Sequence, residues 1–215
     1  MARKLEIDFV SDVVCPWCVV GLGALREALA ELGDEVEPVI RFRPFELNPD
    51  MGPEGENVAE HVARKYGSTP EQSAASRKAI TEAGAKYGFV FSYAPDSRIW
   101  NTFDAHRLLH WAGEEGDQLA MKEALFKANF TDRAAMNETE ALVGAAETAG
   151  MDPARAREIL ASDAYAEDVK REEMLARRGG INAVPSIIFD GKWLLQGAQP
   201  PEVFVKSIRE VLAAE

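Results

Sequence analysis

Two cysteines, Cys15 and Cys18, are the residues of this 215-residue sequence whose type and spacing most clearly suggest chemistry. Pro16 and Trp17 separate them, so the pair has the form Cys-x-x-Cys. Such a pair can cycle between two thiols and a disulfide, contribute two thiolates to a zinc site, or lie inert in a core. Next to a strand-to-helix junction, this spacing favours redox chemistry.

The residues on either side of the pair predict such a junction. Leu5, Ile7 and Phe9 alternate with charged residues, and this period of two is typical of a strand. From Val19 to Leu32, large aliphatic residues recur every three or four positions, a period typical of a helix. The two thiols therefore follow a strand and open a helix.

The start of this predicted helix suggests a role for each cysteine. Pro16 suits the first helical position, because it has no backbone N–H and its φ angle is already helical. Cys15 then occupies the N-cap, where unpaired N–H groups and the positive end of the helix dipole favour a thiolate. We expect Cys15 to be the exposed nucleophile, and Cys18, one turn deeper, to be the buried thiol that resolves a mixed disulfide on Cys15.

A zinc site is the alternative interpretation, and it needs two further ligands. His106 and His110 have a spacing that zinc ligands use, but they lie much further from the cysteines than in a compact zinc finger. They also share a stripe with Ile99 and Phe103 in a segment, 99–112, that predicts an apolar helix. We therefore expect these histidines to pack in a core and no metal to be bound.

Composition limits the possible partners and location. The sequence carries 36 acidic and 24 basic side chains, a net charge of −12 that argues against nucleic-acid binding. No run of 18 apolar residues is present, so no membrane-spanning segment is predicted. The first residues lead into the strand without the pattern of a secretory signal, and we expect a cytoplasmic protein. In that compartment a Cys-x-x-Cys pair is more typical of catalysis than of a structural disulfide.

The rest of the chain predicts strands at its two ends and helices between them. Residues 36–42 predict a second strand, and residues 58–178 predict helices. Residues 186–196 predict two strands joined by an Asp190-Gly191 turn, and a last helix follows Pro200. A strand–helix–strand unit followed at the far end by a hairpin and a helix gives the two halves of a thioredoxin fold.

We accordingly predict an α/β protein with a thioredoxin fold split by a large helical insertion. Residues 1–55 and 179–215 form the thioredoxin-fold domain, and residues 56–178 form the insertion. The sequence leaves open whether the last helix of the insertion belongs to the insertion or to the thioredoxin-fold domain.

Several polar and aromatic residues are candidates for supporting roles. Asp12, just before the cysteines, could take a proton from Cys18, and Glu46 is a second candidate. Each carboxylate could instead be a cap or a surface charge. Further candidates for contacts to the substrate, from the loops and from the start of the predicted 99–112 helix, are Trp17, Phe45, Trp100 and Asn101.

Together these motifs resemble the DsbA family of thioredoxin-fold disulfide oxidoreductases, and within it the FrnE-like branch. The resemblance covers nearly the whole chain and implies thiol–disulfide exchange through Cys15, with protein or low-molecular-weight thiols as partners and no resident cofactor. The dipeptide between the cysteines is Pro-Trp, whereas DsbA itself has Pro-His, so a strongly oxidising character is not implied. The resemblance is carried by the segments 11–18, 43–49, 101–108, 184–185 and 197–199.

Val184 and Pro185 form the second half of the expected site. A proline at the start of a strand is tolerated by sheet geometry alone. Folds of this type place a cis-proline here, facing the thiols, and we predict that Pro185 is cis and lies beside Cys15. The backbone of Val184 would then be free to pair with a substrate segment as an added strand.

Two other functions remain open from the sequence. Kappa-class glutathione transferases and 2-hydroxychromene-2-carboxylate isomerases resemble the chain in fold but place a serine where Cys15 stands. A glutathione-dependent transferase or isomerase is thus one alternative, and glutathione is a possible co-substrate in either case. The other is a metal-binding or chaperone-like module that uses the helical cleft. The sequence leaves open the substrate, the direction of electron flow, and whether the protein is a monomer or a homodimer.

Overall fold

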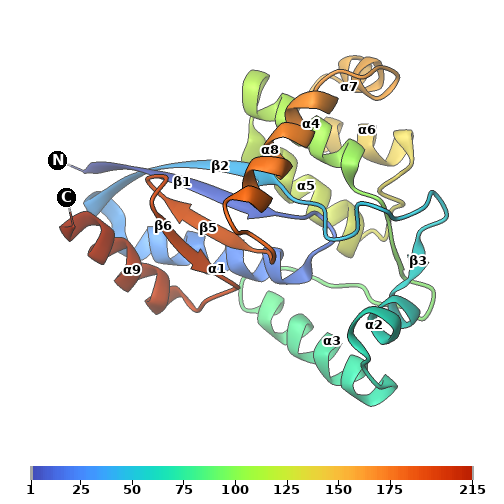
Figure 1. Cartoon of the computed structure of the whole chain (residues 1–215), viewed down its shortest axis with the longest axis horizontal. Coiled ribbons are helices and arrows are strands. Elements are labelled where there is room, and N and C mark those ends of the chain that lie inside the picture. The colour runs from blue at the N-terminus through green and yellow to red at the C-terminus, as the bar shows by residue number, and fades with distance from the viewer. Residues whose placement is uncertain (1, 215) are drawn as a thin grey trace.

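The computed structural model describes residues 2–214 and contains a mixed α/β architecture. Strands occur near both ends of the chain, and helices dominate the middle (Figure 1). In chain order the elements are β1 (Arg3–Ser11), α1 (Pro16–Leu32), a 3-10 turn (Gly33–Glu35), β2 (Val36–Pro44), β3 (Glu56–Asn57), α2 (Val58–Tyr66), α3 (Pro70–Ala85), β4 (Arg98–Ile99), α4 (Phe103–Glu115), α5 (Gln118–Phe130), α6 (Thr139–Thr148), α7 (Pro153–Leu160), α8 (Ala166–Arg178), β5 (Ser186–Phe189), β6 (Trp193–Gln196) and α9 (Pro201–Ala213).

The main sheet has the strand order β2-β1-β5-β6. Strand β1 is parallel to β2 and antiparallel to β5, so Ile7 lies opposite both Ile40 and Phe189. Asp190, Gly191 and Lys192 join β5 to β6, and the first two have positive φ angles, as the central residues of a type I′ turn require. The sheet therefore brings the first and last strands of the chain together around β1.

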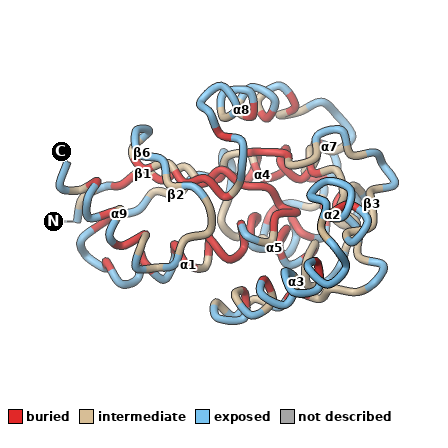
Figure 2. The backbone as a smooth tube through the Cα atoms, turned by 60° about the horizontal axis from the view of Figure 1, so that its bottom comes forward, coloured by how far each residue is buried: buried red, intermediate tan, exposed pale blue. Residues whose placement is uncertain are grey.

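The two faces of the sheet are covered differently. Helices α1 and α9 pack together on one face, and α8 lies on the other (Figures 1 and 2). On the α8 face, Arg43 of β2 pairs with Asp8 of β1 at 2.7 Å and with Glu172 of α8 at 3.2 Å. The alternating β1 residues that belong to the buried core cluster shared with α1 and α9 are Leu5, Ile7 and Phe9.

A single apolar cluster runs from the sheet into the helices. It joins residues of β1, α1 and α9 to residues of α4, α5, α6 and α7. Figure 2 shows the buried parts of α4 and α5 continuing from the buried strands. In the described part of the chain, no helix combines the length and the apolar character that crossing a membrane requires.

The structure corrects the predicted start of the helix at 99–112. Helix α4 begins at Phe103, because Arg98 and Ile99 pair with β3 as the short strand β4. The side chain of Asn101 then accepts a hydrogen bond from the Phe103 N–H and marks the turn into the helix. The predicted stripe that placed Ile99 on one helix face with the histidines was therefore wrong.

Gly23 of α1 packs against Tyr87, which follows α3, and this contact gives a test of the packing. A Cβ atom on Gly23 would lie 2.5 Å from Cγ of Tyr87, well inside van der Waals contact. We expect Gly23→Ala to destabilise the protein by about 1–3 kcal/mol, the usual cost of overpacking, as measured by urea unfolding. Gly144 of α6 is the control, because a Cβ there meets no atom within 4 Å. Gly144→Ala should stabilise the helix by about 0.5–1 kcal/mol, and equal effects of the two variants would contradict the packing.

Candidate active site

Cys15 occupies the N-cap of α1. Its φ and ψ angles are −92° and 109°, and Pro16 follows at the start of the helix. The Cys15 N–H donates to the carbonyl of Asp12 at 3.2 Å, and the Cys18 N–H donates to the carbonyl of Cys15 at 3.0 Å. The backbone thus closes one tight turn on each side of Cys15, at the first turn of the helix.

Val184 and Pro185 lie directly beside this thiol. The peptide bond between them is cis. The Cys15 Sγ donates to the Val184 carbonyl oxygen at 3.6 Å, across a sequence separation of 169 residues. The loop before β5 therefore completes the site from the opposite end of the chain.

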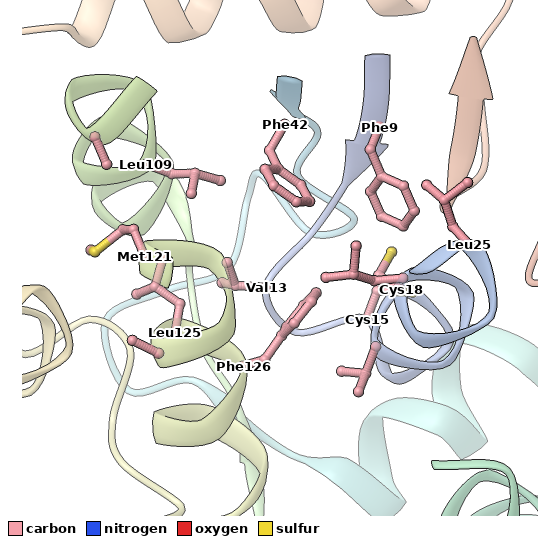
Figure 3. Close-up of a cluster of buried hydrophobic side chains, with 14 of the residues drawn as sticks. Phe9, Val13, Cys15, Cys18, Leu25, Phe42, Leu109, Met121, Leu125 and Phe126 are labelled. Carbon is pink, nitrogen blue, oxygen red and sulfur yellow. The ribbon is translucent and has the colours of Figure 1, made fainter. Parts of the chain in front are cut away.

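Cys15 is more enclosed than the sequence suggested, whereas Cys18 is buried as expected. Cys15 was expected to be exposed, but only 4% of its surface is accessible, because the Val184 loop covers it. Cys18 is completely buried, and both thiols belong to the apolar cluster that also contains Val13 and Phe126 (Figure 3). Burial, followed by the interaction with Cys15, raises the pKa of Cys18 well above its usual value.

A cavity of about 690 Å³ opens beside Cys15. Its walls come from the loops after β1 and β2, from α2, α3 and the end of α5, and from the loop before β5. Trp17, which is 40% exposed, lines the cavity together with Phe45 and Val184. The thiol of Cys15 is therefore reached through this cavity.

Two of the predicted substrate contacts, Trp100 and Asn101, are not among the residues that line the cavity. Asn101 is nevertheless close to it, because its side chain hydrogen-bonds to Glu46, which does line the cavity. The Asn101 amide donates to the carbonyl of Pro49, and its oxygen caps the start of α4. Asn101 therefore connects a loop to a helix in this structure.

The cavity carries basic side chains that the sequence analysis missed. Lys65 is held by the carbonyl of Leu47 and by Asn48, and Arg98 donates to the carbonyl groups of Glu54 and Gly55. In the described part of the chain, Glu46 is the one carboxylic acid that lines the cavity. The basic residues along its walls are Lys65, Arg77, Arg98, Arg133 and Arg177.

The residues that line the cavity are thus mainly basic, although the chain as a whole has a net charge of −12. Lys65 lies on α2 together with Val58 and Val62, which also line the cavity. The other basic residues come from separate elements, and no spacing in the sequence links them.

Asp12 is a buried acceptor that fixes the loops of the site. Its carboxylate accepts from the Leu47 N–H at 2.7 Å and from the Val14 N–H at 3.4 Å, and it lies 3.5 Å from Nε2 of His106. Burial raises the pKa of Asp12, but the interactions with His106, Leu47 and Thr102 outweigh it, so the pKa lies below its usual value. These contacts favour the capping role over proton transfer.

The pKa of Glu46 is shifted in the opposite direction from that of Asp12. Its N–H donates to Oε1 of Glu173 at 2.7 Å, and its carboxyl group faces the cavity. Burial, together with the charges of Glu173 and Asp12, raises the pKa of Glu46 to about 8. Glu46 is therefore largely protonated at neutral pH, next to a site that handles thiol protons.

The two histidines considered as zinc ligands, His106 and His110, have carboxylate neighbours. His106 faces Asp12, and His110 lies 3.4 Å from Glu114 and 3.6 Å from Glu172. Within residues 2–214, no three His, Cys, Asp or Glu side chains are grouped as metal ligands.

The chain matches the family "DSBA-like thioredoxin domain" over residues 6–209, and it belongs to that family. This is a family of thioredoxin-fold oxidoreductases in disulfide chemistry, in agreement with the resemblance derived from the sequence and with the observed fold.

Individual proteins are similar along the whole length. The structure of the "probable DsbA oxidoreductase SCO1869" from Streptomyces coelicolor has a TM-score of 0.93 and 33% identity, with 98% of this chain and 91% of that chain covered. The protein YwbO of Bacillus subtilis (strain 168) is 28% identical over 96% of each chain. The cytosolic disulfide reductase DsbM from Pseudomonas aeruginosa, in a structure with GSH, shares the fold at 14% identity, with a TM-score of 0.59 and coverage of 97% and 99%.

The raised pKa of Glu46 predicts how stability depends on pH. The folded protein holds the Glu46 proton up to about pH 8, whereas the unfolded chain releases it near its ordinary pKa, so stability falls as the pH rises between these values. Glu46→Gln removes this loss, and we expect it to be more stable than the wild type at pH 8, on the order of 2 kcal/mol, and closer to it at pH 5.

Urea unfolding at the two pH values measures the difference. Glu56→Gln is the control of opposite sign, because hydrogen bonds from Arg64 and His61 lower the pKa of Glu56 to about 2. This variant should be less stable than the wild type at neutral pH, with the gap closing as the pH falls toward 2. A Glu46→Gln gain that does not change with pH would contradict the raised pKa.

Proposed function

We propose that this protein is a thiol–disulfide oxidoreductase that exchanges electrons through Cys15 and Cys18 with protein or low-molecular-weight thiols. The observation that carries the proposal is the position of Cys15. Its sulfur lies at a helix N-terminus, 3.6 Å from the Val184 carbonyl, on the wall of a cavity, with Cys18 one turn behind it. A thiolate is both the nucleophile and the leaving group of the exchange, and Cys15 is the thiol that the cavity reaches.

In the oxidising direction, the protein starts with a disulfide between Cys15 and Cys18. A substrate thiolate attacks Sγ of Cys15, and the electron pair of the broken bond leaves on Cys18, which takes up a proton. A second substrate thiolate then attacks the substrate sulfur of the mixed disulfide and releases Cys15 as a thiolate. The substrate gains a disulfide, and the protein is left with two reduced cysteines.

In the reducing direction, the Cys15 thiolate attacks a substrate disulfide and releases one substrate thiolate. Cys18 loses its proton and attacks Sγ of Cys15, which forms the internal disulfide and releases the second substrate thiolate. Two electrons pass from the cysteine pair to the substrate. Val184, which is half-buried beside Cys15 and lines the cavity, offers a strand-like docking edge for a peptide substrate.

The charge of the cavity supports anionic partners. A cavity of about 690 Å³ with basic walls accommodates a small thiol that carries carboxylates. Glutathione has this chemistry, and DsbM, which shares the fold, has been solved with GSH. Glutathione is therefore the low-molecular-weight partner that we propose.

A glutathione-dependent transferase or isomerase is the second candidate function, because the same cavity accommodates glutathione. In that reaction glutathione supplies the nucleophile, and Cys15 is not oxidised. The candidates separate by one assay, because a transferase conjugates glutathione to an electrophile without forming a disulfide in the protein. The Cys-x-x-Cys pair favours exchange, since the second thiol has a role only there.

The exchange reaction predicts distinct behaviour for the two cysteines. A redox titration in glutathione buffers, with alkylation of free thiols and mass measurement, should give a reversible two-electron transition. Cys15→Ser should abolish the transition, and Cys18→Ser should accumulate a mixed disulfide between Cys15 and glutathione, because the resolving thiol is absent. A midpoint near about −120 mV indicates an oxidant and one near about −270 mV a reductase. A wild-type protein that forms no internal disulfide in any buffer refutes the proposal.

The basic cavity predicts a preference for anionic thiols. We expect Arg77→Ala to slow exchange with glutathione roughly threefold or more, with little change for a neutral thiol such as 2-mercaptoethanol. Stopped-flow measurements at low and high salt give the ratio of the exchange rate with glutathione to the rate with 2-mercaptoethanol. High salt should lower this ratio for the wild type. Arg209→Ala, which removes an exposed arginine paired with Glu35 on the opposite part of the molecule, is the control. An unchanged ratio in Arg77→Ala would show that the cavity does not select by charge.

A further inference from the structure

Lys122 of α5 is an unusual lysine. Among residues 2–214 it is the one lysine that is completely buried, and its Nζ atom has no hydrogen-bond partner there. Its ammonium lies 4.7 Å from the centre of the Phe126 ring. By contrast, Lys127 on the same helix is more than half exposed and pairs with Asp132 at 2.6 Å. A buried ammonium without an acceptor costs stability, so Lys122 is not explained by its packing.

The groups that act on Lys122 are those of the candidate active site. The charges that raise its pKa come from Cys18, then Asp12, then Cys15, although burial outweighs them and lowers the pKa to about 8. Phe126, which the ammonium contacts, projects from α5 toward Val13 in the loop that carries the cysteines (Figure 3). Helix α5 therefore delivers one titratable nitrogen to the buried side of the thiol pair.

The resolving step needs such a group. Cys18 is completely buried, and among the causes that lower its raised pKa the charge of Lys122 comes first. Asp12 is poorly suited to accept the Cys18 proton, because its carboxylate already accepts from Leu47 and Val14 and its pKa is low. His106 of α4 lies 3.5 Å from Asp12, and the charge of Asp12 also acts on Glu46 after β2.

We propose that Lys122 is the positioning residue of the resolving thiol: its buried, unpaired ammonium stabilises the thiolate form of Cys18. The Cys18 thiolate attacks Sγ of Cys15 in the mixed disulfide, the bond between Cys15 and the substrate sulfur breaks, and the substrate leaves as a thiolate. The proton that Cys18 releases passes to solvent or to a departing substrate thiolate. This inference rests on the exchange reaction proposed above.

The test uses dithiobis(nitrobenzoate) as the disulfide, because its thiolate product is coloured. Reduced protein should release one equivalent when Cys15 attacks, at a rate that rises with reagent concentration. It should release a second equivalent when Cys18 resolves the mixed disulfide, at a rate independent of concentration. Cys18→Ser assigns the phases, since it should stop after the first equivalent.

We expect Lys122→Met to slow the second phase about tenfold or more at pH 7 and to move the pH midpoint of that phase upward by about one unit. The two effects correspond, because a pKa higher by one unit lowers the fraction of Cys18 thiolate about tenfold at a fixed pH. The first phase should change by less than about twofold, because Cys15 faces the cavity and has its own helix N-terminus. The melting temperature should equal or exceed that of the wild type, since the variant no longer buries a charge. Lys122→Gln, measured in parallel, should show the same kinetics, and Lys127→Met should behave as the wild type.

Each other outcome is decisive. A folded Lys122→Met or Lys122→Gln whose second phase keeps the wild-type rate and pH profile overturns the role of Lys122 and leaves the exchange reaction intact. Equal slowing of both phases, or failure of both variants to fold, assigns Lys122 a structural role and also overturns it. A wild-type protein that releases one equivalent only would instead refute the exchange reaction itself.

Discussion

The buried carboxylate of Asp12 is the interaction on which the geometry of the site depends. Its oxygens accept from the backbone of Val14 in its own loop and of Leu47 in the loop after β2, and they face His106 on α4. Its carbonyl accepts from the Cys15 N–H and so sets the entry into α1. One side chain thereby links the strand that precedes the thiols, a wall of the cavity and the helical part of the chain. The hydrogen bonds from these two backbone N–H groups offset part of the cost of burying this charge.

The electrostatics of the site divide along α1. On the open side of Cys15, the cavity gathers basic side chains from α2, α3 and α8 and so differs in sign from the acidic molecule around it. On the closed side, apolar residues and a lysine surround Cys18. Two chemically similar thiols separated by one helical turn therefore have different surroundings, as sequential roles in one reaction require.

The sequence was informative where a period or a motif was local. The alternation in β1, the helical spacing after Cys18 and the Asp190-Gly191 turn each predict their element directly, and together they predict the thioredoxin fold. The start of α4 was missed because Arg98 and Ile99 pair with β3, a contact between segments that no local pattern encodes. Lys122 was missed for a related reason. Helical periodicity does not reveal that a lysine points inward when the charges that act on it belong to residues of another segment. The burial of Cys15 depends on Val184, far along the chain.

That last contact has a consequence for how the protein is made. Cys15 and Val184 are 169 positions apart, and the central strand β1 forms its antiparallel pairing only with β5, near the end of the chain. During synthesis the cysteine pair leaves the ribosome early, while the strand and loop that enclose it are among the last segments to emerge. For most of translation the thiols are consequently unshielded, and the complete cavity is assembled only at the end by a closure of high contact order. The nascent chain, rather than the finished protein, is the form in which these sulfurs are most open to adventitious oxidation.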